Sequence, residues 1–194
     1  MQSQRVDFPA MSHKTQFPGV YRGISTRDLI AVYKSGPTRL GGVLTGLSDE
    51  ELKVRPREGK WSAQEIALHV ADAEIMGAAR MRQAWAEPGS TFVVYDQNAW
   101  ASELDYRGRD SRDVVAALHL FSELRRHGTR LLEGARPGDW KKWGSHGEWG
   151  TLTFRQLLEL YADHAERHIE QIAAIRSRLG KPIRLPRLLP KRLY

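Results

Sequence analysis

The 194-residue sequence contains no cysteine, and no part of it approaches about eighteen consecutive apolar residues. The first absence excludes disulfides, thiolate nucleophiles and cysteine-ligated zinc sites, and it is typical of cytoplasmic proteins. The second absence excludes a transmembrane helix. Residues 1–14 show neither an apolar segment nor a small-residue cleavage pattern, so we expect no secretion signal. Hydrophobic residues make up 41% of the chain, which is enough for a globular core.

The net charge of +7 is concentrated at one end of the chain. Residues 176–194 contain seven basic residues and no acidic one, and the remaining 23 basic residues balance the 23 acidic ones. Pro182, Pro186 and Pro190 exclude a regular basic helix there. We interpret residues 181–194 as a basic, proline-containing tail, either solvated or lying against the body. Nucleic acid is therefore an unlikely partner, and a membrane is not expected.

The first part of the chain is expected to be irregular and then helical. Residues 1–25 form an irregular leader in this interpretation. A short helix should run from Thr26 to Tyr33. Gly36-Pro37 should interrupt it, because proline favours the first turn of a helix, and a second helical piece should then run to Leu47.

Three capping boxes mark the starts of later helices, because a serine or threonine is followed three residues on by Glu or Gln. They are Ser48-Asp-Glu-Glu51, Ser62-Ala-Gln-Glu65 and Thr153-Phe-Arg-Gln156. Apolar residues at helical spacing predict long helices from 62 to about 85, from 111 to before Pro137, and from 153 to Gly180. Residues 86–110 are expected to be a long connection, extended or a lid around 92–95. The economical fold is an all-α four-helix bundle over residues 26–180.

Two histidines four residues apart give the strongest chemical signal. His164 and His168 share one face of the last helix, because four residues make slightly more than one helical turn. That face carries the apolar stripe, so both rings should point inward. His69 lies on the apolar stripe of another helix. An inward imidazole without a partner costs about 1–3 kcal/mol, and a shared divalent ion would remove that cost.

These histidines also have other interpretations. Each ring could be a core side chain hydrogen-bonded to the backbone or to a carboxylate. A zinc-protease HExxH motif is excluded, because Ala165 stands where its glutamate would be. A di-iron carboxylate site is also excluded, because no histidine has a glutamate three residues before it. Ligand type alone does not select among zinc, nickel, iron, cobalt and copper.

Several neighbouring residues could assist the three histidines. Asp72 lies three residues after His69 and is the better candidate for orienting a ligand or acting as a general base. Glu65 shares the same side of the helix, but its capping role is favoured. Tyr161 is expected to pack. His146 could reach the site but is disfavoured as a ligand.

The same residues resemble the DinB/YfiT-like superfamily of metalloenzymes over roughly residues 28–180. The matching segments are Gly59-Lys-Trp-Ser62 leading to Glu65-Ile-Ala-Leu-His69, then Ser145-His146-Gly-Glu-Trp-Gly150, then Tyr161-Ala-Asp-His164-Ala-Glu-Arg-His168-Ile-Glu-Gln171. The resemblance implies an up-down four-helix bundle with metal ligands at His69, His164 and His168. One departure is Gly147, where relatives commonly have proline after the histidine.

The resemblance also implies a nickel, zinc or iron ion, a homodimer, and use of a low-molecular-weight thiol such as bacillithiol, mycothiol or glutathione. The first hypothesis is therefore a metal-dependent transferase that adds such a thiol to a small electrophilic substrate. Asp72 would be its base, and the loop around Trp143 and Trp149 would form a pocket wall. The alternatives are a metal-dependent hydrolase of a small molecule, a non-enzymatic metal-binding bundle, and nucleic-acid binding through the tail.

Overall fold

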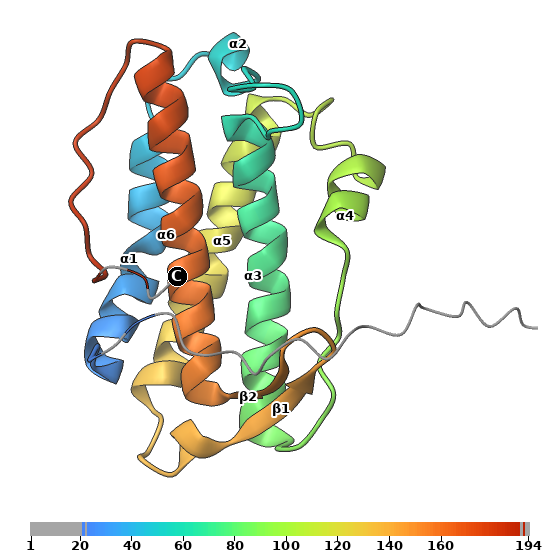
Figure 1. Cartoon of the computed structure of the whole chain (residues 1–194), viewed down its shortest axis with the longest axis vertical. Helices are drawn as coiled ribbons and strands as arrows, with labels where there is room; N and C mark the ends of the chain where they lie inside the picture. Colours follow the sequence, from blue (N-terminus) through green and yellow to red (C-terminus); the bar gives the residue numbers. More distant parts are fainter. Residues whose placement is uncertain (1–20, 22, 191, 193–194) are drawn as a thin grey trace, which may run out of the picture.

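The computed structural model describes residues 21, 23–190 and 192. Most of the predicted leader, residues 1–20 and 22, lies outside the described residues. In chain order the elements are α1 (Thr26–Leu44), α2 (Asp49–Leu52), α3 (Ala63–Ala86), α4 (Gln97–Glu103), α5 (Ser111–Glu133), the 3-10 turn η1 (Asp139–Lys141), β1 (Trp143–His146), β2 (Gly150–Thr153) and α6 (Phe154–Arg178) (Figure 1).

The four long helices form a bundle, so the predicted all-α four-helix bundle is confirmed, although its helices do not simply alternate in direction. α1 and α3 each pack against both α5 and α6. The chain runs along the bundle in α1 and returns in α3, and residues 87–110 then cross back outside it, so α5 runs in the same direction as α3 (Figure 1). Gln64, near the start of α3, shows this return. Its Nε2 donates to the carbonyl oxygens of Tyr106 at 2.9 Å and Arg109 at 3.0 Å, just before α5 begins.

The capping boxes predicted from the sequence are all present. Ser48, Ser62 and Thr153 each accept a hydrogen bond from the amide three residues later, and the side chain of that later residue reaches back. After α6, Gly180 has φ of 72°, a left-handed conformation that favours glycine and ends the helix as expected. Local hydrogen bonds therefore fix where the two histidine-bearing helices begin.

The first helix differs from the expectation, because α1 continues through Pro37 without interruption. Proline has no N–H, so the carbonyl of Tyr33 one turn earlier loses its helical donor. Arg125 of α5 supplies a replacement, with Nη1 2.9 Å from that carbonyl oxygen. Arg125 is only 1% exposed and also pairs with Glu74 of α3, Nε to Oε2 2.8 Å. A partner on a distant helix thus satisfies the carbonyl that Pro37 leaves free, and no local pattern reveals it.

Two short elements lie where the sequence predicted only connections. β1 and β2 form an antiparallel hairpin in which Trp143 faces Thr153. Each strand has four residues, too few for a clear alternating pattern. The segment after α3 adds to the edge of β1, with the amide of Phe92 donating to the carbonyl of Ser145 at 2.8 Å. Next, Asp96 caps α4 by accepting hydrogen bonds from two amides of its first turn.

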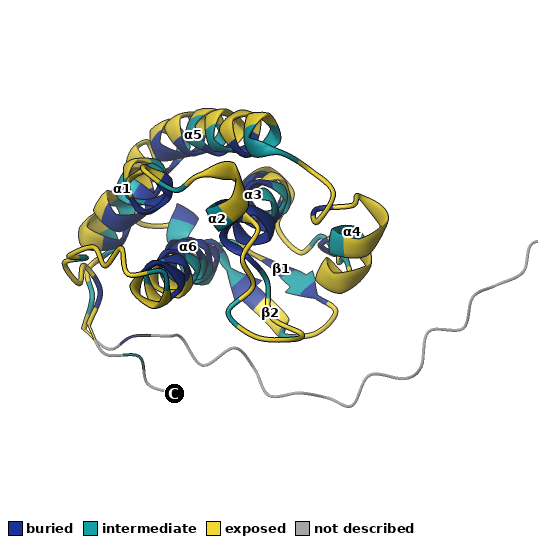
Figure 2. Ribbon diagram, turned by 90° about the horizontal axis from the view of Figure 1, so that it is seen from above, coloured by how far each residue is buried: buried dark blue, intermediate teal, exposed yellow. Residues whose placement is uncertain are grey.

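The buried residues of the long helices face one another, and exposed residues cover the outside (Figure 2). They form two apolar clusters. One includes Phe154 and Leu157 near the hairpin, and the other includes Val70 and Ile172 nearer α2. Within the described residues, no helix has the length and apolar character needed to cross a membrane.

Residues 181–190 return along the outside of the bundle beside α6 (Figure 1). Leu189 is buried and joins the apolar cluster near the hairpin. Lys181 pairs with Glu51 at 2.6 Å, and Arg192 pairs with Asp163 at 2.7 Å. Of the two interpretations of the tail, residues 181–190 and 192 therefore show the one in which it lies against the body.

Candidate metal centre

Three histidine rings from two helices meet inside the bundle. His164 and His168 lie one turn apart on α6, and His69 faces them from α3. The Nε2 atom of His164 is 3.1 Å from Nε2 of His69 and 3.2 Å from Nε2 of His168. Across the described chain, these three residues form the one group of histidine and carboxylate ligands close enough to share an ion. The structure therefore brings together the three side chains that the sequence singled out.

Hydrogen bonds among the three rings cannot satisfy all the facing nitrogens. A ring nitrogen carries either one hydrogen or one lone pair, so His164 Nε2 can share a hydrogen with only one of its two neighbours. Two nitrogens bound tetrahedrally to one ion at about 2.0–2.1 Å lie roughly 3.3 Å apart. The observed spacings of 3.1 and 3.2 Å are close to that value. All three ligand nitrogens lie within 4.8 Å of one another, so the donor set is close enough to share a single divalent ion.

Burial holds the rings in the neutral form that metal binding requires. It lowers the pKa of His69 to about 3 and that of His168 to about 4. Burial also takes the pKa of His164 well below its ordinary value, and the neighbouring rings lower it further. His168 Nδ1 lies 2.9 Å from Oε1 of Gln171, which places the hydrogen on Nδ1 and leaves the Nε2 lone pair facing the centre. The ring of Trp61 packs 4.8 Å from that of His69, which helps to fix its position.

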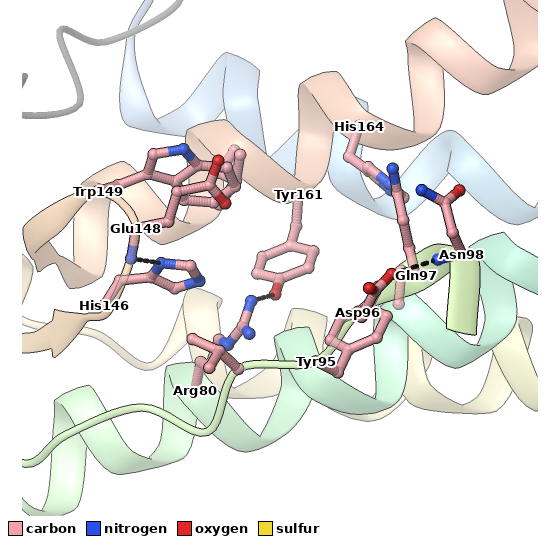
Figure 3. A pocket seen from close by; sticks show the side chains of 13 residues that line it. Arg80, Tyr95, Asp96, Gln97, Asn98, His146, Glu148, Trp149, Tyr161 and His164 are labelled. Carbon is pink, nitrogen blue, oxygen red and sulfur yellow. Dashed lines mark hydrogen bonds between the residues drawn. The ribbon is translucent and has the colours of Figure 1, made fainter. Parts of the chain in front are cut away.

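A cavity of about 850 Å³ opens on the His164 side of the centre. Figure 3 shows Arg80 bonded to Tyr161 in this cavity, the ring of His146 facing the same space, and His164 farther along the wall. Arg80 Nη1 donates to the hydroxyl of Tyr161 at 2.9 Å. Trp149 stacks on His146 with ring centroids 4.5 Å apart. The wall therefore combines aromatic faces with a few polar groups, which is typical of small-molecule sites.

A second cavity of about 620 Å³ opens on the His168 side. Trp61 and Gln171 line it. Gln97 and Asn98, at the start of α4, line both cavities. The three rings therefore lie between two spaces that share one wall, and the start of α4 provides that wall.

The structure places the predicted accessory residues in different settings. Glu65 completes the capping box of α3 and pairs with Arg55, which confirms the favoured capping role. Asp72 accepts a hydrogen bond from the Tyr106 hydroxyl, and its negative charge helps burial to raise the pKa of Tyr95 in the wall of the larger cavity. No hydrogen bond joins Asp72 to the three histidines in the described part of the chain.

The remaining predicted residues divide between the cavity and the outer surface. His146 and Tyr161 line the larger cavity, together with Trp149. His146 is not a member of the three-histidine group. Trp143 is not among the lining residues and is 42% exposed, so only one of the two tryptophans named from the sequence forms part of the wall.

Sequence reasoning missed Arg80 and the start of α4. Arg80 lies on the buried face of α3, two turns beyond Ala73, and is 4% exposed. The sequence feature that could have revealed Arg80 is its position among the apolar residues of the helix stripe, where an arginine is unusual. Gly77 is a second such signal, because a methyl group there would stand 2.6 Å from Cε1 of Tyr161. The absence of a side chain at Gly77 lets the Tyr161 ring lie against α3.

The sequence profile of the DinB superfamily matches residues 33–172. A protein of Geobacillus kaustophilus is 28% identical over 166 residues, covering 85% of this chain and 92% of that protein. One of Oceanobacillus iheyensis is 25% identical over 163 residues, covering 84% and 92%. Both are named "putative metal-dependent hydrolase".

A solved structure is also similar. YfiT of Bacillus subtilis is described as "a probable metal-dependent hydrolase with an unusual four-helix bundle topology". It superposes with a TM-score of 0.76 at 25% identity, covering 82% of this chain and 92% of that one. The similarity therefore spans the bundle and both histidine-bearing helices.

Proposed function

The chain belongs to the DinB superfamily, and from this membership and the three-histidine centre we propose that it is a metal-dependent hydrolase of a small molecule. The observation that carries the proposal is the convergence of three neutral Nε2 atoms beside a large cavity. The names of the relatives support the same reaction class. Three protein ligands leave room at an ion for a reactant, which is the composition of an open catalytic site.

His69, His164 and His168 would hold the ion, and imidazole ligands suit zinc, nickel and iron alike. When bound, a divalent ion acts as a Lewis acid and lowers the pKa of a reactant O–H or S–H that reaches it. The chain itself orients the ligands, through the contact of Gln171 with His168 and the packing of Trp61 on His69. The aromatic wall of the cavity would position the substrate and displace water from it.

Asp72 remains the candidate general base. Its carboxylate accepts a hydrogen bond from the Tyr106 hydroxyl, and its charge helps to raise the pKa of Tyr95 in the cavity wall. In Asp72→Asn we expect turnover to fall while metal content stays at the wild-type level, because the amide cannot accept a proton. Turnover equal to the wild type would assign Asp72 a structural role only.

Hydrolysis of a panel of small chromogenic esters, amides and lactones by the metal-loaded protein tests the proposal. We expect turnover that is lost on chelation and in His164→Ala. The matched control is His119→Ala, which removes an exposed histidine on α5 and should leave turnover unchanged. Turnover that survives both chelation and His164→Ala, or no turnover with any substrate, would contradict the proposal.

Thiol transfer is the second candidate, and the paired cavities favour it. One cavity of about 850 Å³ is lined by His164 and another of about 620 Å³ by His168, so two reactants could reach the centre through separate cavities. Metal-loaded protein incubated with monochlorobimane and a panel of low-molecular-weight thiols separates the two reactions. Metal-dependent conjugation without hydrolysis would identify a transferase, and absence of conjugation with every thiol would remove that candidate.

A further inference from the structure

Arg80 carries a buried positive charge without a carboxylate partner among the described residues. It is 4% exposed, and its Nε and Nη2 atoms donate to the carbonyl of Val93 at 3.1 and 2.6 Å. Nη1 donates to the Tyr161 hydroxyl at 2.9 Å. Arg125, another deeply buried guanidinium of the bundle, instead pairs with Glu74. Arg80 therefore differs from Arg125 in having only neutral partners.

An unpaired buried cation is costly, so a partner is expected where the charge meets open space. A guanidinium has five N–H donors, and the three hydrogen bonds described account for three of them. The two remaining donors belong to a side chain that lines the cavity beside His164. An oxyanion accepts two parallel N–H bonds from a guanidinium and neutralises its charge.

The neighbouring polar groups of the cavity also present hydrogens rather than lone pairs. His146 Nδ1 accepts a hydrogen bond from the amide of Glu148 at 3.2 Å, so the neutral ring carries its hydrogen on Nε2. Burial and the charge of Arg80 lower the pKa of His146 to about 4, which keeps the ring neutral at physiological pH. Because the Tyr161 oxygen accepts from Arg80, its own O–H is left to donate.

Two carboxylates also line this cavity, and neither neutralises Arg80. Asp96 accepts hydrogen bonds from two amides at the start of α4, where it serves as the helix cap. Glu148 is exposed at the turn of the hairpin. In the described structure, neither forms an ion pair with Arg80. The deep wall of the cavity is therefore positive and rich in donors.

We propose that Arg80, Tyr161 and His146 form a subsite for an oxyanion, and that the substrate carries a carboxylate or phosphate group whose oxygens these donors bind beside the three-histidine centre. That the bound molecule is a substrate rests on the proposed function, but binding of an oxyanion at the subsite does not require the reaction. Trp149 and Tyr95 in the same wall favour a ligand in which the anionic group is attached to an apolar or aromatic body.

Binding of three matched probes tests the subsite. The full-length protein, with its metal content measured, is titrated calorimetrically with benzoate, phenyl phosphate and the neutral benzamide. We expect at least one of the anions to bind about tenfold or more tightly than benzamide. In Arg80→Met this preference should disappear, and Arg80→Lys should retain part of it, because the charge remains while the planar donor pair is lost. Arg27→Met removes an exposed arginine at the start of α1 and should behave as the wild type.

The outcomes separate the subsite from the proposed reaction. Whichever anion shows the Arg80-dependent preference identifies the group as carboxylate or phosphate. Anion binding that persists in His164→Ala but not in Arg80→Met supports the subsite even if no hydrolysis is found. Equal affinity for benzamide and both anions overturns the proposal, and so does an anion preference unchanged in Arg80→Met, whether or not the protein is a hydrolase. Circular dichroism of the Arg80 variants excludes loss of folding as the cause.

Discussion

Pro37 and Arg125 should be energetically coupled, because they act on the same carbonyl group. Pro37 removes the helical donor of the Tyr33 carbonyl, and Arg125 Nη1 supplies another at 2.9 Å. Tyr33 is fully buried, so in Arg125→Met its carbonyl would lack a partner at a cost of about 1–3 kcal/mol. Pro37→Ala in that background restores an N–H one turn away and removes the cost.

The expected coupling follows from comparing Pro37→Ala in two backgrounds. In the wild type the substitution changes the free energy of unfolding through helix propensity and the entropy of the unfolded chain. In the Arg125→Met background, Pro37→Ala should have the same effects and should also raise the free energy of unfolding by about 1–3 kcal/mol, because the new N–H satisfies the Tyr33 carbonyl. Arg125→Met also leaves Glu74 buried without its ion-pair partner, which costs about 3–5 kcal/mol. That cost is present in both members of the comparison and cancels.

Urea unfolding of the wild type, the two single variants and the double variant measures the coupling. The control cycle uses Arg126→Met, which removes the neighbouring exposed arginine paired with Glu123 on the surface. That cycle should be additive within about 0.5 kcal/mol. If the Arg125 cycle is equally additive, the idea that its guanidinium replaces the missing bond of α1 is refuted.

Three further predictions concern the cavity, the buried histidines and the tail. Gly77→Ala should lower the free energy of unfolding by up to about 2 kcal/mol, because the methyl group collides with Tyr161 at a cost of about 1–3 kcal/mol and the gain in helix propensity returns about 1 kcal/mol; a higher midpoint in urea than that of the wild type would show that the ring moves freely. Below pH 6.5 the unfolded chain binds protons at His69 and His146 that the folded chain, with pKa values of about 3 and about 4, does not bind. The free energy of unfolding of the metal-free protein should therefore be constant above pH 6.5 and fall from there towards pH 4, which a series of urea titrations measures. A free energy of unfolding that stays constant down to pH 4 would count against buried neutral rings. Removal of residues 181–194 exposes the apolar site that Leu189 covers and should lower the free energy of unfolding by at least about 1.5–3 kcal/mol. If the shortened chain unfolds at the same urea midpoint as the full-length chain, the tail contributes nothing to stability.

The parts of the fold that the sequence predicts are those with local signals. Capping boxes at Ser62 and Thr153 and apolar stripes at helical spacing were enough for the starts and faces of α3 and α6. The three histidines followed, because a helix puts His164 and His168 on one face and His69 on an inward stripe. In this part of the molecule each local preference agrees with the final structure.

The features that escaped prediction depend on contacts between distant segments. α1 continues through Pro37, and the Tyr33 carbonyl that proline leaves without a helical donor accepts a hydrogen bond from Arg125, far along the chain. The polar wall of the cavity depends on Arg80 facing Tyr161 across the bundle. Asp96 is a residue type that favours a helix N-cap, but α4 buries no residue, so its sequence has no apolar stripe to distinguish it from a loop. Helical propensity alone is a weak guide in such a segment.

Elemental analysis of the protein purified without a histidine tag tests the central claim most directly. After exposure to divalent metals and removal of the excess, the wild type should retain one ion per chain. The combined variant His69→Ala, His164→Ala and His168→Ala should retain none while keeping its helical circular dichroism. A wild type that holds no ion, or a triple variant that holds as much as the wild type, would contradict a metal centre at these three rings.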